Sequence, residues 1–204
     1  VDVIQEENTE DFEIMAGMAP SEDTYLKTPV LTLAKNRIVW LLVLMLSAMV
    51  TGALLQHYEA AISALPLLVS FIPMLMDTGG NGGSQASTMV IRGLALDEIR
   101  PADLLTVWWK EARVALLCGG VLAAVNFLRI WVQYGDVGIA AVVALTLICT
   151  IFIAKSLGCL LPMAAKKLRL DPALMASPLI TTITDACSIL VFFQFSTLIL
   201  ADRL

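Results

Sequence analysis

The stretch PMLMDTGGNGGSQ, residues 73–85, interrupts an apolar segment with an aspartate, four glycines, an asparagine, a serine and a glutamine. Of the 204 residues in the chain, 58% are hydrophobic and only 15% are charged. Long runs nearly free of charge in such a composition are typical of a membrane protein. The polar motif therefore lies in a setting where polar groups are expensive and need a specific reason to be present.

Apolar segments long enough to cross a bilayer recur along the chain. Residues 38–55 reach roughly 27 Å at about 1.5 Å per residue, close to the thickness of the hydrocarbon layer. A secretory signal would be shorter and followed by a small-residue cleavage site. The other segments are residues 61–91, 114–132, 137–161 and 174–200. The sequence predicts an all-α membrane protein with five transmembrane helices per subunit.

Lysine and arginine are distributed unequally among the predicted loops. Ten of the 13 precede the first span or lie in the connections between spans two and three and between spans four and five. The other side holds only Arg129 and Arg203, while Lys155 lies within span four without an evident partner. Since cytoplasmic loops carry the excess of basic residues, the N-terminus is expected in the cytosol. We expect a multi-pass protein of the cell membrane.

The N-terminal segment is acidic. Residues 1–23 contain eight aspartates and glutamates and no lysine or arginine, and residues 9–18 are compatible with a short helix. Charge alone is as consistent with a solvated tail as with a cation-binding cytosolic surface. We expect an acidic cytosolic segment over residues 1–29 and a transmembrane domain over residues 30–204.

Two aspartates lie near the middle of predicted spans, Asp77 in the second and Asp185 in the fifth. An ionised carboxylate at the bilayer centre costs on the order of 2.5 to 3.5 kcal/mol even on lenient scales. The structural alternative is a protonated aspartic acid that a neighbouring helix satisfies. An intramembrane acid more often marks a functional site.

A polar stripe accompanies the second of these acids. Ser177, Thr181 and Asp185 are four residues apart, with Ser188 near the same stripe, so they share a helical face that must turn away from lipid. Serine and threonine stripes alone often serve helix packing. With a carboxylate in the stripe, the pattern indicates a water-lined path.

The opening motif has a matching composition. The glycines of residues 79–83 permit a kink or a close approach of helices, and Asn81, Ser84 and Gln85 supply neutral oxygens and donors. Oxygen-rich groups without thiols suit a hard cation, and Mg²⁺ is often held through its own waters. Ligand type leaves calcium, manganese, sodium and protons open. The motif lacks the lysine of a Walker phosphate loop.

The motifs PMLMDTGGNGGSQ with the following IRGLALDEI, and DPALMASPLITTITDACSILVFF, resemble the MgtE family of magnesium channels and transporters. The resemblance extends over residues 30–200. It implies a homodimer in which the second and fifth helices of each subunit line a pore at the interface. It also implies cytosolic N and CBS domains that sense magnesium, joined to the first span by a plug helix, and residues 1–20 look like the end of that region.

The resemblance also implies roles for individual residues. The selectivity aspartate of the family falls on Asp185, and positions 177 and 181 match pore-lining positions, the first being asparagine in some members. The asparagine of the TGGN element is matched as well, and an acid in the loop before span five matches a residue implicated in regulatory magnesium binding. The complete set of candidate metal residues is Asp185, Thr181, Ser177, Asn81, Asp77 and Asp171.

These observations predict a magnesium-permeable pore that carries largely hydrated Mg²⁺ inward. A potential of 100 mV is worth about 2.3 kcal/mol per unit charge, so a divalent ion needs no ATP for inward flow. Pairing with a second copy would shelter the polar stripes and bring both Asp185 carboxylates to one axis. The alternative is an intramembrane aspartyl protease using Asp77 and Asp185, although the GxGD element of many such enzymes is absent. A structural scaffold does not explain two acids in lipid, and no nucleic-acid partner is expected.

Overall fold

The computed structural model describes residues 10, 12–19, 25–175 and 177–203, except for the side chains of Met175 and Ser177. Most of the predicted acidic segment therefore lies outside the described residues. Of the helix expected over residues 9–18, residue 10 and residues 12–15 are described as helical.

Helices make up nearly all of the regular structure, and the described residues contain no strand, which confirms the all-α class. The first half of the chain forms α2 (Val30–His57), α3 (Glu59–Ala64), a 3₁₀ segment (Pro66–Phe71) and α4 (Ile72–Ala95). The second half forms a 3₁₀ turn (Pro101–Asp103), α5 (Leu104–Tyr134), α6 (Val137–Lys167), another 3₁₀ turn (Pro172–Met175) and α7 (Ser177–Ile199).

Within the described residues, four helices are long and apolar enough to cross a membrane, namely α2, α5 with its preceding turn, α6 and α7. The helix α4 is not among them, because the aspartate, asparagine, glutamine and glycines of the opening motif lower its hydropathy. The four spans are thus supported by length and composition. The fifth span stays a prediction.

The second predicted span, residues 61–91, is divided in the structure. The chain breaks at Leu65, whose φ of −136° and ψ of 78° lie outside the helical region. A residue that precedes proline is disfavoured in the α conformation, so Pro66 explains the break. Pro73, in contrast, lies in the first turn of α4, where a missing N–H is tolerated.

Two other helices extend beyond the predicted spans. α5 begins at Leu104 instead of near residue 114, and α6 continues to Lys167 through Pro162 instead of ending near residue 161. The apolar segment of the sequence ends at the charged residues 110, 111 and 113, so hydropathy places the span boundary there. A helix can carry charged residues on one face and continue through them. A proline inside a transmembrane helix removes one hydrogen bond, which neighbouring helices compensate.

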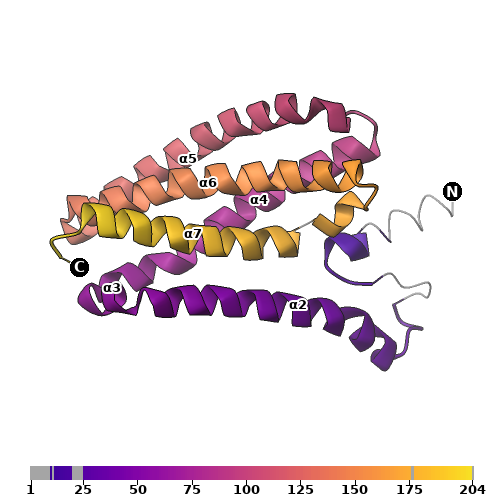
Figure 1. The fold of residues 1–204 in the computed structure, drawn as a ribbon, viewed down its shortest axis with the longest axis horizontal. Helices are drawn as coiled ribbons and strands as arrows, with labels where there is room; N and C mark the ends of the chain where they lie inside the picture. Colours follow the sequence, from indigo (N-terminus) through magenta and orange to yellow (C-terminus); the bar gives the residue numbers. More distant parts are fainter. Residues whose placement is uncertain (1–9, 11, 20–24, 176, 204) are drawn as a thin grey trace.

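The helices form an elongated bundle in which α4 crosses beneath α6 and α7, and α5 packs along α6 (Figure 1). The helix α2 lies at the margin, where it contacts mainly α7, and Thr51 is its only buried residue. Its C-terminal end is held by Tyr58, whose ring stacks on buried Phe193 with centroids 4.5 Å apart. Phe192 and Phe71 continue this core.

The connections segregate to the two ends of the bundle. Figure 1 places the start of α2, the α4–α5 connection and the α6–α7 connection at one end, and the α2–α3 turn, the α5–α6 turn and the C-terminus at the other. The basic residues of the predicted cytosolic loops therefore share one end, as the charge distribution requires.

Candidate cation site

Glycines on α4 allow α7 to approach closely. A Cβ added at Gly79 would lie 2.8 Å from Thr184 Cγ2, and one added at Gly80 would lie 2.9 Å from Thr181 Cγ2. Real Cβ atoms essentially never come this close to another heavy atom, so a larger residue at either position would force the threonine side chains or α7 itself to shift. The glycines of the opening motif thus serve close approach, and α4 runs through them without a break.

The crossing of α4 with α6 is equally tight. A Cβ at Gly83 would lie 3.1 Å from the carbonyl oxygen of Ala154, and one at Gly158 would meet the carbonyl oxygen of Gly83. The contacts involve backbone atoms, which cannot rotate away as a side chain can. α4 is therefore fixed in the groove between α6 and α7 through its glycine face.

The polar residues of α4 lie on a different face. Asp77, Asn81 and Gln85 are spaced four residues apart and are all exposed in the single chain. Residues at this spacing form a stripe along one side of a helix. Exposed polar side chains at the depth of a membrane require water or protein beside them.

A cavity of about 180 Å³ lies where this stripe meets α7. It brings together four of the six predicted residues from two helices about 100 positions apart in sequence, and it has room for several water molecules. Its lining consists of Met76, Asp77, Gly80, Asn81, Thr181 and Asp185.

The chemistry of this cavity suits a cation. The hydroxyl of Thr181 donates to the carbonyl oxygen of Pro178 at 2.9 Å, which leaves its oxygen lone pairs free to accept. An ionised carboxylate is purely a hydrogen-bond acceptor, and the amide of Asn81 presents one further acceptor oxygen. The described residues contain no group of three or more His, Cys, Asp or Glu side chains placed to hold a metal. The cavity thus offers carboxylate, amide and hydroxyl oxygens, which are the ligand types that hard cations prefer.

The polar stripe predicted on α7 divides into two parts. Thr181 and Asp185 line the cavity, whereas Thr184 and Ser188 are buried against α4 beside Gly79. The hydroxyl of Ser188 donates within its own helix to the carbonyl oxygen of Thr184 at 2.7 Å. Ser188 thus lies on the same side of α7 as Thr181, as its spacing predicts, but it is packed against α4 and does not line the cavity.

Two of the predicted residues are not placed in the cavity. The side chain of Ser177 lies outside the described part of the chain. Asp171 lies in the α6–α7 connection, where it is exposed and accepts a hydrogen bond from the N–H of Ala173 at 2.8 Å. A regulatory role for Asp171 would thus be separate from the intramembrane cavity.

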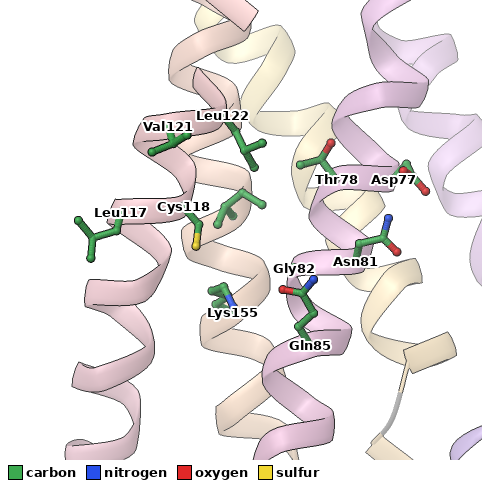
Figure 2. Close-up of a pocket in the computed structure, with 11 residues that line it drawn as sticks. Asp77, Thr78, Asn81, Gly82, Gln85, Leu117, Cys118, Val121, Leu122 and Lys155 are labelled. Carbon is green, nitrogen blue, oxygen red and sulfur yellow. The ribbon is translucent and has the colours of Figure 1, made fainter. Parts of the chain in front are cut away.

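A larger cavity of about 560 Å³ lies beside α4, α5 and α6 (Figure 2). Asp77 and Asn81 line it as well, together with Gln85 and Lys155. The ammonium of Lys155 donates to a carboxylate oxygen of Glu111 at 3.5 Å. The hydropathy pattern assigns Glu111 to a loop, so the sequence alone shows no partner for Lys155. In the structure α5 begins at Leu104, and Glu111 therefore belongs to a helix of the bundle.

Fold and cavity together define a polytopic helical membrane protein with an oxygen-lined, cation-compatible cavity at the crossing of two helices. Residues 72–195 match the family model MgtE, described as a divalent cation transporter. The chain belongs to the MgtE family, as the motifs predicted. This is a family of transporters and not of enzymes, so the alternative of an intramembrane aspartyl protease is not supported.

Named relatives agree with the family. The chain is 33% identical over 202 residues to the magnesium transporter MgtE of Thermus thermophilus, an alignment that covers 98% of this chain and 44% of the relative. It is 30% identical over 197 residues to the magnesium transporter MgtE of Bacillus subtilis, covering 97% of this chain and 43% of the relative. The chain therefore spans less than half the length of these relatives.

Proposed function

We propose that residues 30–204 form the pore domain of a magnesium channel or transporter that carries Mg²⁺ passively into the cell. The observation that carries this proposal is the cavity at the α4–α7 crossing, where Asp77 and Asp185 face a common space of about 180 Å³. Family membership and the names of the relatives support Mg²⁺ as the transported ion. The membrane potential supplies about 2.3 kcal/mol per unit charge for each 100 mV, so a divalent ion flows inward without ATP.

In this proposal α4 is the fifth span, and a second copy of the chain covers its polar stripe. In a single chain Asp77, Asn81 and Gln85 are exposed, which lipid would not tolerate. A two-fold axis beside α4 and α7 would bring the two stripes together around a water-filled path. The N-terminus lies in the cytosol with the basic loops. Sensor domains of the N and CBS type belong to the same protein outside residues 30–204.

Asp185 is the residue that recognises the ion, and the ion keeps most of its water. Within one chain the cavity offers four polar side chains, two carboxylates, one amide and one hydroxyl. Mg²⁺ demands near-ideal octahedral geometry and gives up its waters reluctantly, so these groups serve it better through its own water molecules. Thr181, Asn81 and Ser177 then contact water rather than the metal. Asp77 adds negative charge on the facing helix, and Asp171 contributes to regulation from the loop.

The decisive experiment measures Mg²⁺ flux into liposomes that contain the purified full chain. Asp185→Ala should abolish flux while the oligomer stays assembled, and Asp185→Asn should be strongly impaired because the charge is lost. Glu98→Ala is the matched control, since Glu98 is exposed in the α4–α5 connection and lies outside both cavities. Wild-type flux in an assembled Asp185→Ala protein would remove Asp185 from the role of ion recognition.

Subunit arrangement is tested by crosslinking. Thr181→Cys, in a background that lacks the four native cysteines, should form a disulfide between subunits if the α7 faces meet across a two-fold axis. A cysteine at Val50 is the control, because Val50 is exposed on α2 away from the cavity. A monodisperse monomer that conducts Mg²⁺ would contradict the dimeric pore.

Hydration of the ion is tested with cobalt hexammine, which imitates hydrated Mg²⁺ but does not exchange its ligands. It should compete with Mg²⁺ for the cavity and inhibit flux. Direct distances near 2.1 Å between Mg²⁺ and several protein oxygens would instead establish a dehydrating site.

A further inference from the structure

Lys155 is a charged side chain buried in the middle of the bundle. It belongs to α6, its exposed fraction is 5%, and Glu111 of α5 accepts its hydrogen bond at 3.5 Å. Burying an ammonium is expensive even when a carboxylate partner is present. Passive transport through the smaller cavity does not require this ion pair. Helix packing does not require it either, because an apolar pair of similar size would hold α5 against α6 equally well.

The position of Lys155 relates it to the cation site. Lys155 lines the larger cavity together with Asp77 and Asn81, and these same two residues line the smaller cavity with Asp185 (Figure 2). Lys155 and the acid of α4 therefore border one open space. Glu111 lines neither cavity, so of the two charged side chains only Lys155 borders the space shared with Asp77.

The walls of the larger cavity make the charge effective over distance. They consist mainly of apolar side chains, among them Leu117, Val121, Leu122 and Ile151. Apolar surroundings screen a charge less than bulk water does. A fixed positive charge at Lys155 thus weakens the negative potential that Asp77 and Asp185 create for a cation.

We propose that Lys155, held in place by Glu111, limits the affinity of the cation site so that the ion can leave it. Conduction requires binding that is favourable enough for entry and weak enough for release. Two carboxylates facing one divalent ion in an apolar setting bind strongly, and a nearby ammonium reduces that strength. The inference rests on the proposed transport function and assigns to the buried pair a role within it.

The test compares two neutral variants of the same pair in the reconstituted full chain. Lys155→Met removes the repelling charge, and should lower the half-saturating Mg²⁺ concentration and the maximal flux, each by about three- to tenfold. Glu111→Gln removes the offsetting carboxylate, and should raise the half-saturating concentration. If the pair were purely structural, both variants would change the half-saturating Mg²⁺ concentration in the same direction. That result would overturn the proposal.

The double variant Lys155→Met with Glu111→Gln covers the case in which a single unpaired charge prevents assembly. Since Lys155 lines the larger cavity and Glu111 does not, the double variant should still have a lower half-saturating Mg²⁺ concentration than wild type. An unchanged value in an assembled double variant would overturn the proposal. Absence of Mg²⁺ flux in the wild-type protein, in contrast, would overturn the transport function itself and the inference with it.

Discussion

The helices α2 and α4 differ sharply in hydropathy and in burial. α2 is 28 residues long, strongly apolar, almost entirely exposed, and contains one buried residue. α4 is 24 residues long, too polar to qualify as a span by composition, and buried along its glycine face. The helix that is easiest to recognise as a span lines neither described cavity, and the helix that is hardest to recognise lines both.

The difference shows how strictly the structure constrains the residues of each helix. The exposed apolar surface of α2 requires only hydrophobicity and length, so many sequences satisfy it. The glycines of α4 instead meet individual atoms of α6 and α7, and its polar residues face defined cavities. Substitutions should therefore be tolerated in α2 and penalised in α4 and its partners.

The largest effect is expected from filling the cavity. Thr181→Leu places a bulky side chain between α4 and α7 where an ion and its waters need space, and should eliminate detectable Mg²⁺ flux in liposomes. Thr181→Ser keeps the hydroxyl and should remain close to wild type. Val50→Leu adds bulk to an exposed position of α2 and should have no effect. Full flux through an assembled Thr181→Leu protein would show that ions do not pass this point.

A smaller effect is expected from one methyl group at the helix crossing. In Gly83→Ala the new Cβ would lie 2.6 Å from Ile180 Cγ2 and 3.1 Å from the carbonyl oxygen of Ala154. Overpacking of this kind costs about 1–3 kcal/mol, seen as a lower melting temperature in detergent. Gly52→Ala in α2 is the matched control, because a Cβ there meets nothing within 4 Å. Equal stability of the two variants would refute the importance of the close crossing.

Much of the fold follows from sequence because hydropathy and charge act locally. Hydropathy locates the membrane-spanning parts of α2, α6 and α7, and it makes the helical class clear. The break at Leu65 is less accessible, since Pro66 and Pro73 look alike in a hydropathy profile. Only one of them interrupts the chain, because the other lies in the first turn of a helix.

The sequence identifies the residues of the candidate site better than it predicts their arrangement in space. The cost of burying acids singles out Asp77 and Asp185 without any structure. How far the cavity extends along α7 depends on where α4 crosses it. Spacing alone therefore could not show that Thr181 lines the cavity while Ser188, two turns further along the same side, is packed against Gly79. The partner of Lys155 lies 44 positions away, and pairing over such a separation requires the structure.

The smallest effect concerns the end of the bundle opposite the basic loops. Asp136 accepts a hydrogen bond from the N–H of Ile139 at the start of α6, and Arg203 near the C-terminus pairs with its carboxylate. Burial acts to raise the pKa of Asp136, but the Ile139 hydrogen bond and the Arg203 charge outweigh it and leave the pKa below the usual 3.8. A lowered pKa in the folded state stabilises the protein above pH 3.8, and this stabilisation is lost as the pH falls below that value through the folded pKa.

Asp136→Asn keeps a side chain that caps a helix well and removes only the charge. Because the pair is partly exposed, the variant should lose no more than about 1 kcal/mol at pH 7. Melting temperatures of wild type and variant in detergent should therefore differ slightly at pH 7 and converge at a pH below the lowered pKa of Asp136, where the carboxyl is protonated. Other carboxyl groups titrate in both proteins, so the difference between the two is the quantity to follow. A difference of the same size at both pH values would mean that the capping geometry, rather than the charge of Asp136, stabilises this end of the bundle.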